Sequence, residues 1–278
     1  MLYGMPMTPA PQTWRIIDTG PFSGPTNMAI DEALLSAFAA GKGALPVLRI
    51  YGWQPPALSL GRYQKTAEVL DLHRCAAHNV PIVRRITGGG VIWHASELTY
   101  SLVCAPRHLP DGLSVKGSFR VLTSFLLAFY RSLGLDAAWA MDSDPHHAAL
   151  GERTAFCFAG RESYDIIAGD RKIGGNAQRR TRAAIFQHGS IPLVNRIEEG
   201  VGYLRERPAG IETATTSLKE EGITTGRDVL APKLADAFKE AMGVTLVGDG
   251  LTAEEQAQAE RLLAGKYRDA AWNLDGAE

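Results

Sequence analysis

Two glycine motifs, about 80 residues apart, constrain the fold of this chain more than any other feature. The first is RRITGGGVIWH, residues 84–94, in which three successive glycines lie between strand-like runs. Glycines permit positive φ angles and let a ligand approach the backbone, because no Cβ stands in the way. No Gly-Lys-Ser/Thr and no helical pattern follow them, which argues against a Walker A or dinucleotide-binding loop. Taken alone, the segment is equally consistent with a glycine-rich hairpin turn.

The second motif lies in FCFAGRESYDIIAGDRKIGGNAQRRTRAAIFQHGSI, residues 156–190. Its glycines, Gly174 and Gly175, again allow close approach to the backbone. Residues 171–182 carry no acid and five bases, which are Arg171, Lys172, Arg179, Arg180 and Arg182. In a chain of net charge −1, this local asymmetry indicates an anionic ligand or an acidic partner surface. A solvated basic edge is the competing interpretation.

Composition excludes several classes of protein. The chain has 278 residues, of which 45% are hydrophobic, so it can bury a substantial core and is not disordered. Its near-zero net charge argues against nucleic-acid binding. No apolar run approaches the roughly 20 residues that span a bilayer, and the N-terminus lacks the pattern of a signal peptide. Three widely spaced cysteines fit neither a disulfide framework nor a zinc site. We therefore expect a cytoplasmic globular protein without membrane partners.

Hydrophobic periodicity predicts a mixture of helices and strands without a regular βαβ rhythm. We expect helices over residues 26–41, 115–133, 228–242 and 252–264, strands over 47–51, 57–60, 81–86, 97–104 and 184–194, and a hairpin over 163–175 that turns at Gly169-Asp170. This pattern predicts the α+β class, with mixed β-sheets flanked by helices.

The ends of these helices carry recognisable signals. Thr26 or Asn27 can cap the first helix, and Asp31 and Glu32 are expected in its first turn, where the helix dipole favours anions. Thr252 and Glu255 form the pattern of a capping box before the last helix.

Cys157 is the cysteine of chemical interest, because it lies between two phenylalanines and fifteen residues before Lys172. Cys75 and Cys104 are expected to be core residues. A lone cysteine is more often structural than nucleophilic, and the sequence cannot show whether the candidate bases His94 and His188 lie near Cys157. His146 and His147, beside two aspartates, are usually solvated in such a polar loop, and we predict no metal site.

Taken together, the two motifs resemble the biotin/lipoate ligase and octanoyltransferase superfamily. The segments NMAIDEALL, LRIYGWQPPALSLGRYQ and KYRDAAWN are similar to that family too, so the resemblance covers about residues 14–274. It implies a ligase-type catalytic core over residues 42–250 and a helical tail over 251–278 packed on that core. We expect one domain over residues 1–278, without a separate C-terminal accessory domain.

Within the superfamily, the Phe-Cys-Phe stretch followed by SYDIIAGDRKIGGNAQRR is most similar to octanoyl-[acyl carrier protein]:protein N-octanoyltransferases of the bacillus type. That resemblance implies an acyl-thioester intermediate on Cys157, with Lys172 lowering the pKa of the thiol. The implied substrate-binding residues are Arg85, Gly88, Gly89, Gly90, His94, Gly174, Gly175, Asn176, Gln178, His188 and Gly189.

The reaction implied by the resemblance is transfer of an octanoyl group from octanoyl-acyl carrier protein to a lysine. The implied acceptors are the glycine cleavage H protein and the lipoyl domains of 2-oxoacid dehydrogenases. The resemblance also implies that the reaction needs no cofactor. The basic stretch over residues 171–182 is expected to attract the acidic carrier. Apolar side chains near the motifs, Val91, Ile92, Trp93 and Phe156, are candidates for a tunnel around the acyl chain, or are ordinary core. We expect a monomer.

Two other enzymes remain as alternatives. An ATP-dependent lipoate-protein ligase shares both motifs but typically lacks the cysteine. A carrier-to-carrier amidotransferase would use the same cysteine chemistry with an acylated H protein as donor. The need for ATP separates the first alternative from our prediction, and the identity of the donor separates the second.

Overall fold

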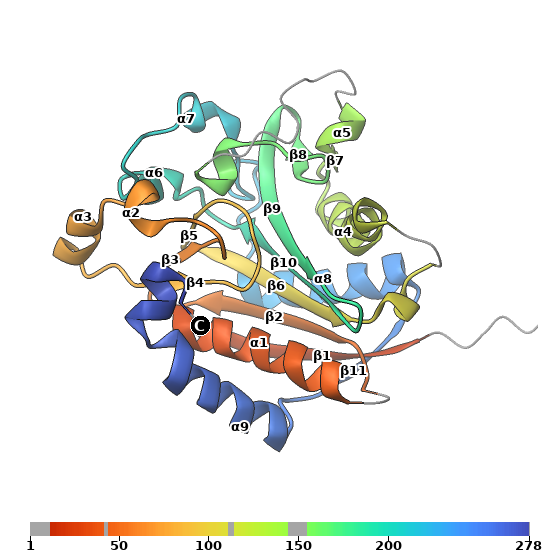
Figure 1. Ribbon diagram of the computed structural model, residues 1–278. Coiled ribbons are helices and arrows are strands. Elements are labelled where there is room, and N and C mark those ends of the chain that lie inside the picture. The colour runs from red at the N-terminus through yellow and green to blue at the C-terminus, as the bar shows by residue number, and fades with distance from the viewer. Residues whose placement is uncertain (1–11, 42–43, 111–113, 144–154, 278) are drawn as a thin grey trace, which may run out of the picture.

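A large mixed sheet forms the centre of the computed structural model, which describes residues 12–41, 44–110, 114–143 and 155–277. Its strands are β1 (Thr13–Phe22), β2 (Val47–Trp53), β6 (Glu97–Cys104), β7 (Ala137–Trp139), β8 (Ile166–Ala168), β9 (Arg171–Arg180), β10 (Ile185–Pro192) and β11 (Thr245–Gly248). Their order is β11-β1-β2-β6-β10-β9-β8-β7 (Figure 1). β1 pairs in parallel with β11 and β2, and the other neighbours are antiparallel. The predicted α+β class with a mixed sheet is confirmed.

A second sheet of three short strands carries the first glycine motif. Its strands are β3 (Ala57–Leu60), β4 (Ile82–Arg84) and β5 (Ile92–His94), in the order β4-β3-β5. β4 is shorter than the predicted strand over residues 81–86: regular pairing ends at Arg84, although the Arg85 N–H still donates to the Leu60 carbonyl of β3 at 3.0 Å. The loop therefore connects two strands that both pair with β3.

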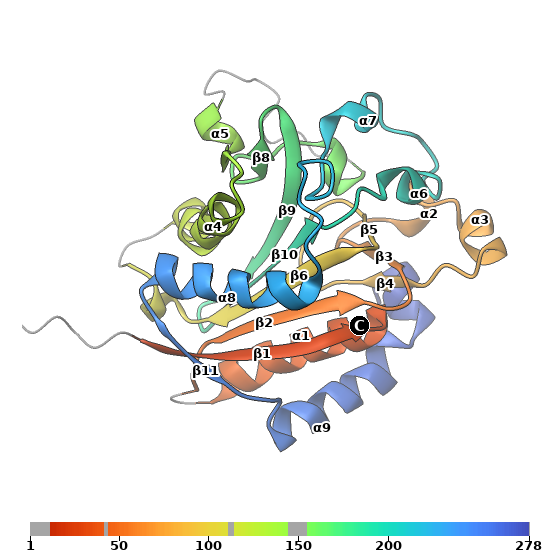
Figure 2. The same ribbon diagram turned by 180° about the vertical axis from the view of Figure 1, so that it is seen from behind.

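Helices cover both faces of the large sheet. α4 (Val115–Ser132) and α8 (Arg227–Met242) pack on one face, where they share a hydrophobic core with alternate residues of β2, β6 and β10. α1 (Gly24–Ala40) lies on the opposite face with α9 (Ala253–Leu262) beside it (Figures 1 and 2). The short helices are α2 (Thr66–Val69), α3 (Leu72–Ala77), α5 (Ala140–Ser143), α6 (Ile197–Val201), α7 (Ile211–Ala214), the 3₁₀ turns η1 (Pro106–His108) and η2 (Cys157–Ala159), and the π turns η3 (Leu263–Tyr267) and η4 (Ala271–Asp275).

Local sequence signals account for the ends of several helices. α9 begins with the predicted capping box, in which Thr252 and Glu255 each bond the other's backbone N–H. α1 differs from the prediction, because its N-cap is Ser23 rather than Thr26 or Asn27. The earlier start moves Asp31 out of the first turn.

Asp31 is instead the anionic centre of a buried polar network between α1 and the sheet. Its carboxylate accepts hydrogen bonds from Arg49 at 2.8 Å, from the Ser101 hydroxyl at 2.8 Å and from the Tyr51 hydroxyl at 2.9 Å. Asp31 and Arg49 are 1% and 0% exposed, so each charge depends on the other for compensation.

We expect Asp31→Ala to lower the free energy of unfolding by about 3–5 kcal/mol, because it leaves the Arg49 guanidinium buried and uncompensated. Glu68→Ala is the matched control, since it breaks the solvent-exposed Lys65–Glu68 pair and should cause no measurable change. Urea unfolding monitored by circular dichroism measures both. Equal stability of Asp31→Ala and the native protein would contradict this role.

Residues outside the region 42–250 take part in the same architecture. β1, which the sequence analysis did not predict, pairs with β2 along seven registered positions. At the other end, Trp272 is buried, and the backbone around it accepts hydrogen bonds from the Arg84 guanidinium. Among the described residues, no helix is long and apolar enough to cross a membrane. The placement of a domain boundary at residue 42 or 251 stays a prediction.

Candidate active site

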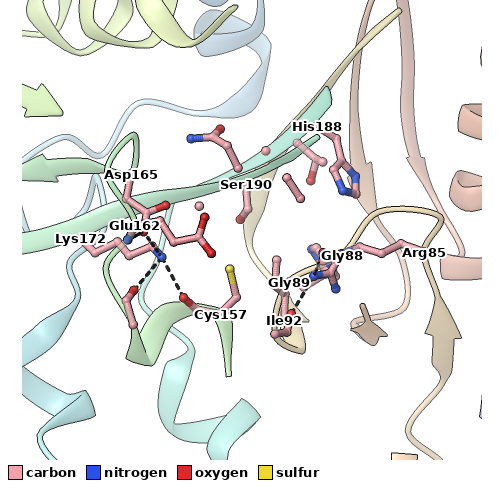
Figure 3. Close-up of a pocket in the computed structure, with 18 of the residues that line it drawn as sticks. Arg85, Gly88, Gly89, Ile92, Cys157, Glu162, Asp165, Lys172, His188 and Ser190 are labelled. Carbon is pink, nitrogen blue, oxygen red and sulfur yellow. Dashed lines mark hydrogen bonds and ion pairs between the residues drawn. The ribbon is translucent and has the colours of Figure 1, made fainter. Parts of the chain in front are cut away.

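A cavity of about 470 Å³ opens between the large sheet and the glycine loop of the small sheet. Its volume falls in the range of small-molecule sites, roughly 300–1,000 Å³. Figure 3 shows Lys172 and Asp165 on one side, Cys157 between, and the loop with Arg85 opposite. The lining residues are Tyr63, Gln64, Arg85, Gly88, Gly89, Gly90, Ile92, His94, Thr99, Cys157, Gly160, Glu162, Asp165, Lys172, Gly175, Asn176, Ala177, His188, Gly189 and Ser190.

Arg85 holds the glycine loop in shape. Its Nη2 donates to the carbonyl oxygens of Gly88 at 2.9 Å and Gly90 at 2.7 Å, and its Nη1 donates to the Ser59 carbonyl at 2.8 Å. Gly89 has a φ of +95°, and a Cβ there would lie 2.9 Å from Nη2. The sequence therefore needs a glycine at this position for the loop to close over the guanidinium.

Cys157 is brought to the cavity by its neighbours in the chain. Its N–H donates to the Val91 carbonyl at 3.0 Å, which fixes the cysteine beside the end of the glycine loop. The flanking Phe156 and Phe158 are buried in a hydrophobic cluster that they share with Leu58, Leu60 and Val91 of the small sheet and its glycine loop. A Cβ on Gly175 would lie 3.2 Å from the Cys157 sulfur, so this glycine leaves the space that the thiol occupies.

Lys172 is fully engaged by acceptors. Its Nζ lies 2.6 Å from the Asp165 carboxylate, and it donates to the carbonyl oxygens of Cys157 at 2.8 Å and Gly160 at 3.0 Å. An ammonium group has three N–H donors, and these three partners use all of them. The Lys172 and Asp165 side chains are only 2% and 5% exposed. Lys172 is therefore positioned as a fixed buried cation.

The pKa shifts of Lys172 and Cys157 agree with a charged lysine beside a neutral thiol. Burial by itself would lower the pKa of Lys172, but the Asp165 carboxylate and Cys157 outweigh burial and leave the pKa above its ordinary value. Burial raises the pKa of the Cys157 thiol; Lys172 and Arg85 oppose the rise, and Asp165 and Glu162 add to it. Lys172 does lower the thiol pKa relative to a site without it. The net direction is nevertheless upward, so the resting side chain is a thiol.

We expect alkylation of Cys157 by iodoacetamide to accelerate with pH above about 8.5, the ordinary thiol pKa, and to show no plateau near neutrality. The thiolate is the nucleophile, and a raised pKa means that it forms only at higher pH. Intact mass spectrometry against time, at a series of pH values, gives the rate. A plateau below about pH 8 would contradict the raised pKa.

The structure brings together most of the residues that the sequence singled out. Eleven of the thirteen line the cavity: Arg85, Gly88, Gly89, Gly90, His94, Cys157, Lys172, Gly175, Asn176, His188 and Gly189. Gly174 and Gln178 do not line it. Successive side chains of a strand point to opposite faces, and Gln178 lies on the α4 face, where it accepts a hydrogen bond from Ser118 at 3.1 Å.

Asn176 has the same orientation as Gln178. Its Oδ1 accepts a hydrogen bond from the Tyr100 hydroxyl at 2.6 Å, and Tyr100 belongs to the core beneath α4 and α8. A Cβ on Gly189 would lie 2.2 Å from that Oδ1, so Gly189 makes room for the Asn176 amide. The functional group of Asn176 is thus directed to the core side of the sheet.

The two candidate histidines are both buried and bonded. His94 stacks on Trp53 with ring centroids 3.8 Å apart, and its ring nitrogens contact Ser59 at 2.7 Å and Glu97 at 2.8 Å. His188 contacts the Thr87 hydroxyl at 2.8 Å. Burial lowers the pKa of His188 well below its ordinary value, and Arg85 and His94 add to that effect, so His188 is neutral.

Several residues that line the cavity were not predicted from the sequence as site residues. Asp165 is the most important of them, and the predicted hairpin could have located it. A turn at Gly169-Asp170 brings the residues just before the turn's first strand opposite the second glycine motif, where Ile166 pairs with Gly174. Ser190 follows His188 by two residues, and strand alternation predicts that the two side chains share a face. Glu162, in the loop before β8, has no comparable signal.

The remaining sequence candidates have different locations. The bases of the predicted basic stretch differ in their surroundings. Arg171 pairs with Glu221 at 2.6 Å, Lys172 is buried, and Arg180 contacts the start of α4. Arg179 and Arg182 are exposed, and attraction of an acidic carrier by this stretch stays a prediction. Of the candidate tunnel residues, Ile92 lines the cavity and Val91 is buried in the hydrophobic cluster around Phe156 and Phe158. Trp93 and Phe156 border a smaller cavity of about 30 Å³, which also touches Ser190. The His146-His147 pair lies outside the described residues.

The family model and the curated relatives that match this chain point to the same family. The family model of the lipoyl protein ligase A/B catalytic domain matches residues 23–243. Two curated relatives carry the name octanoyltransferase LipM. The protein from Symbiobacterium thermophilum is 39% identical over 276 residues, covering 94% of this chain and 98% of its own. The one from Geobacillus kaustophilus is 36% identical over 277 residues, covering 95% and 99%.

Solved structures show the same fold at lower identity. A crystal structure of lipoate-protein ligase A bound with ATP aligns with a TM-score of 0.80 and 23% identity, over 95% of this chain and 99% of that one. The putative lipoate protein ligase Ta0514 from T. acidophilum, with bound lipoic acid, aligns with a TM-score of 0.78 and 23% identity, over 95% and 100%. At 23% identity, these two structures show that the fold is shared, and they show nothing about the reaction.

Proposed function

The chain belongs to the lipoyl protein ligase A/B catalytic domain family, and we propose that it transfers an octanoyl group from a carrier thioester to a protein lysine. Family membership confirms the resemblance of the two glycine motifs. The chain is an acyltransferase, as its full-length relatives named octanoyltransferase LipM indicate. The donor, the covalent intermediate and the acceptor are parts of our proposal.

One observation carries the proposal: the Cys157 thiol lies in the cavity beside a buried cation. A Cβ on Gly175 would lie 3.2 Å from the sulfur, so the glycine leaves room for the thiol, and Lys172 is anchored by the carbonyl of Cys157 itself. A sulfur nucleophile beside a fixed cation is the arrangement expected for covalent acyl transfer. An adenylating enzyme has no chemical use for such a thiol.

In the first step, Cys157 attacks the thioester carbonyl of octanoyl-acyl carrier protein. The donor C–S bond breaks while a new C–S bond forms to Cys157, and the thiol proton of Cys157 ends on the sulfur of the carrier. The reaction exchanges one thioester for another, so it needs no ATP. The Lys172 charge stabilises negative charge that develops on sulfur and on the carbonyl oxygen.

In the second step, the ε-amine of a lysine on the acceptor attacks the octanoyl thioester of Cys157. An amide forms, the Cys157 C–S bond breaks, and the thiol is regenerated. The amide is the more stable acyl derivative, which makes transfer to the acceptor effectively irreversible. The proposed acceptors are the glycine cleavage H protein and lipoyl domains of 2-oxoacid dehydrogenases, and the product is the precursor of a lipoyl group.

A three-armed transfer assay tests the proposal. The first two arms combine apo H protein with octanoyl-acyl carrier protein or with octanoate plus ATP, and the third combines octanoylated H protein with an apo lipoyl domain. Mass spectrometry of the acceptor in each arm then reports octanoylation. We expect rapid modification in the first arm without ATP. Modification only in the second arm would identify a ligase, and modification only in the third would identify a carrier-to-carrier amidotransferase.

A further inference from the structure

A chain of buried polar side chains runs along the wall of the cavity, where Ser190, Thr99 and His94 line it. Its centre is the carboxylate of Glu97, whose Oε2 accepts from the Ser190 hydroxyl at 2.7 Å. Oε1 accepts from the Thr99 hydroxyl and lies 2.8 Å from Nδ1 of His94. Nε2 of His94 contacts the Ser59 hydroxyl at 2.7 Å. None of the catalytic roles described above uses this chain.

Ser190 is the member of this chain that lies on the reacting side. It belongs to β10 and pairs with Gly175 of β9, the glycine whose missing Cβ leaves room for the Cys157 sulfur. Directly paired residues of neighbouring strands have Cβ positions roughly 4.5–5.5 Å apart on the same face. Ser190 lines the cavity, and Figure 3 shows it facing the space above Cys157. With its proton donated to Glu97, its oxygen lone pairs remain available to the cavity.

The second step of the proposed reaction needs a proton acceptor. A lysine with the ordinary pKa of about 10.4 is a neutral amine in only about one molecule in a few thousand at pH 7. Lys172 cannot take the proton, because it is already charged and all three of its N–H donors are engaged. His188 is directed to Thr87.

We propose that Ser190 and Glu97 form a proton relay that deprotonates the lysine of the acceptor. This inference rests on the proposed function and names the base of its second step. The ammonium of the acceptor gives a proton to the Ser190 oxygen while the proton of Ser190 moves to Oε2 of Glu97. The neutral amine attacks the octanoyl carbonyl, its second proton ends on the sulfur of Cys157 as the C–S bond breaks, and Glu97 later releases its proton to solvent.

The surroundings of Glu97 suit this role. Its side chain is 3% exposed, so the carboxylate is held by its hydrogen-bond donors rather than by water. Nδ1 of His94 lies 2.8 Å from Oε1 and helps to hold the carboxylate in place toward Ser190. Ser59, the far partner of His94, accepts hydrogen bonds from Arg85, which also binds the glycine loop. The relay is therefore built into the scaffold of the cavity.

The test separates the two steps on isolated octanoyl-enzyme. Native protein, Ser190→Ala and Ser190→Thr are acylated with octanoyl-acyl carrier protein, purified, and mixed with apo H protein or with hydroxylamine. Hydroxylamine is already neutral at pH 7 and need not lose a proton before it attacks. We expect Ser190→Ala to slow deacylation by the H protein about 10²-fold, with little change in acylation or in hydroxylamine cleavage. Ser190→Thr, which keeps the hydroxyl, should restore the rate.

Other results would overturn the relay. An unchanged rate with the H protein would remove Ser190 from the reaction, and equal slowing with both nucleophiles would show a merely structural role. Glu97→Gln provides a second variant, which should show the same split between nucleophiles; if it deacylates normally with the H protein, Glu97 is not the proton acceptor. Absence of octanoyl-enzyme in the native protein is a distinct result, which would overturn the proposed function and the relay with it.

Discussion

Cys157→Ala is expected to abolish acyl-enzyme formation and to reduce octanoyl transfer by about 10³-fold or more, because no other nucleophile replaces the sulfur. The protein should remain folded, since the change removes one atom from a residue at the cavity and leaves the backbone hydrogen bond to Val91 in place. A transfer assay with octanoyl-acyl carrier protein and apo H protein measures the loss, and circular dichroism checks the fold.

The other two cysteines provide matched controls. Cys75 and Cys104 are buried in the hydrophobic clusters, and burial raises the pKa of Cys104 to about 12, so its thiol is unreactive. Cys75→Ala and Cys104→Ala should lose some stability but retain the transfer rate. If Cys157→Ala transferred octanoyl groups as fast as these controls, Cys157 would have no role in the chemistry.

The second large effect is expected at Lys172. Lys172→Met leaves the Asp165 carboxylate buried and without its ion pair, which should lower the free energy of unfolding by about 3–5 kcal/mol. The same change removes the cation that opposes the rise of the Cys157 pKa, so acylation at neutral pH should slow strongly as well. Urea unfolding and single-turnover acylation measure the two losses separately.

A double variant distinguishes charge balance from catalysis. Lys172→Met with Asp165→Asn removes both buried charges, so most of the lost stability should return. Acylation should stay below the native rate, because Lys172 lowers the Cys157 pKa more than Asp165 raises it. Full recovery of acylation in the double variant would show that Lys172 serves the fold alone. A single Lys172→Met variant with native stability would contradict the buried ion pair.

Much of the fold was predictable, because it depends on local patterns. The strand over residues 97–104 was predicted at its observed bounds, and the helix over 115–133 ends one residue earlier, at Ser132. Gly169 has the positive φ expected at the hairpin turn. β1, which lies between β11 and β2 near one edge of the large sheet, was not predicted, because parallel pairing is a long-range property that leaves no turn signal nearby.

The site was predictable in outline and not in detail. The two glycine motifs were expected to act together, and the structure brings them around one cavity with Cys157 and Lys172. The faces of β9 could not be assigned, because a register shift beside Ile166 lets Lys172 and Gly175 share the cavity side while Gln178 points to the core. Glu97 and Ser190 were missed for a related reason: the pairing of β6 with β10 decides their contact.

The covalent octanoyl-enzyme is the central claim, and intact mass spectrometry tests it most directly. The native protein and Cys157→Ala are each incubated with octanoyl-acyl carrier protein in the absence of ATP. We predict that the native protein gains the mass of one octanoyl group, that hydroxylamine removes it, and that Cys157→Ala gains nothing. A native protein that stays unmodified while it forms an acyl-adenylate from octanoate or lipoate and ATP would contradict the account, and would make Cys157 a bystander in a ligase.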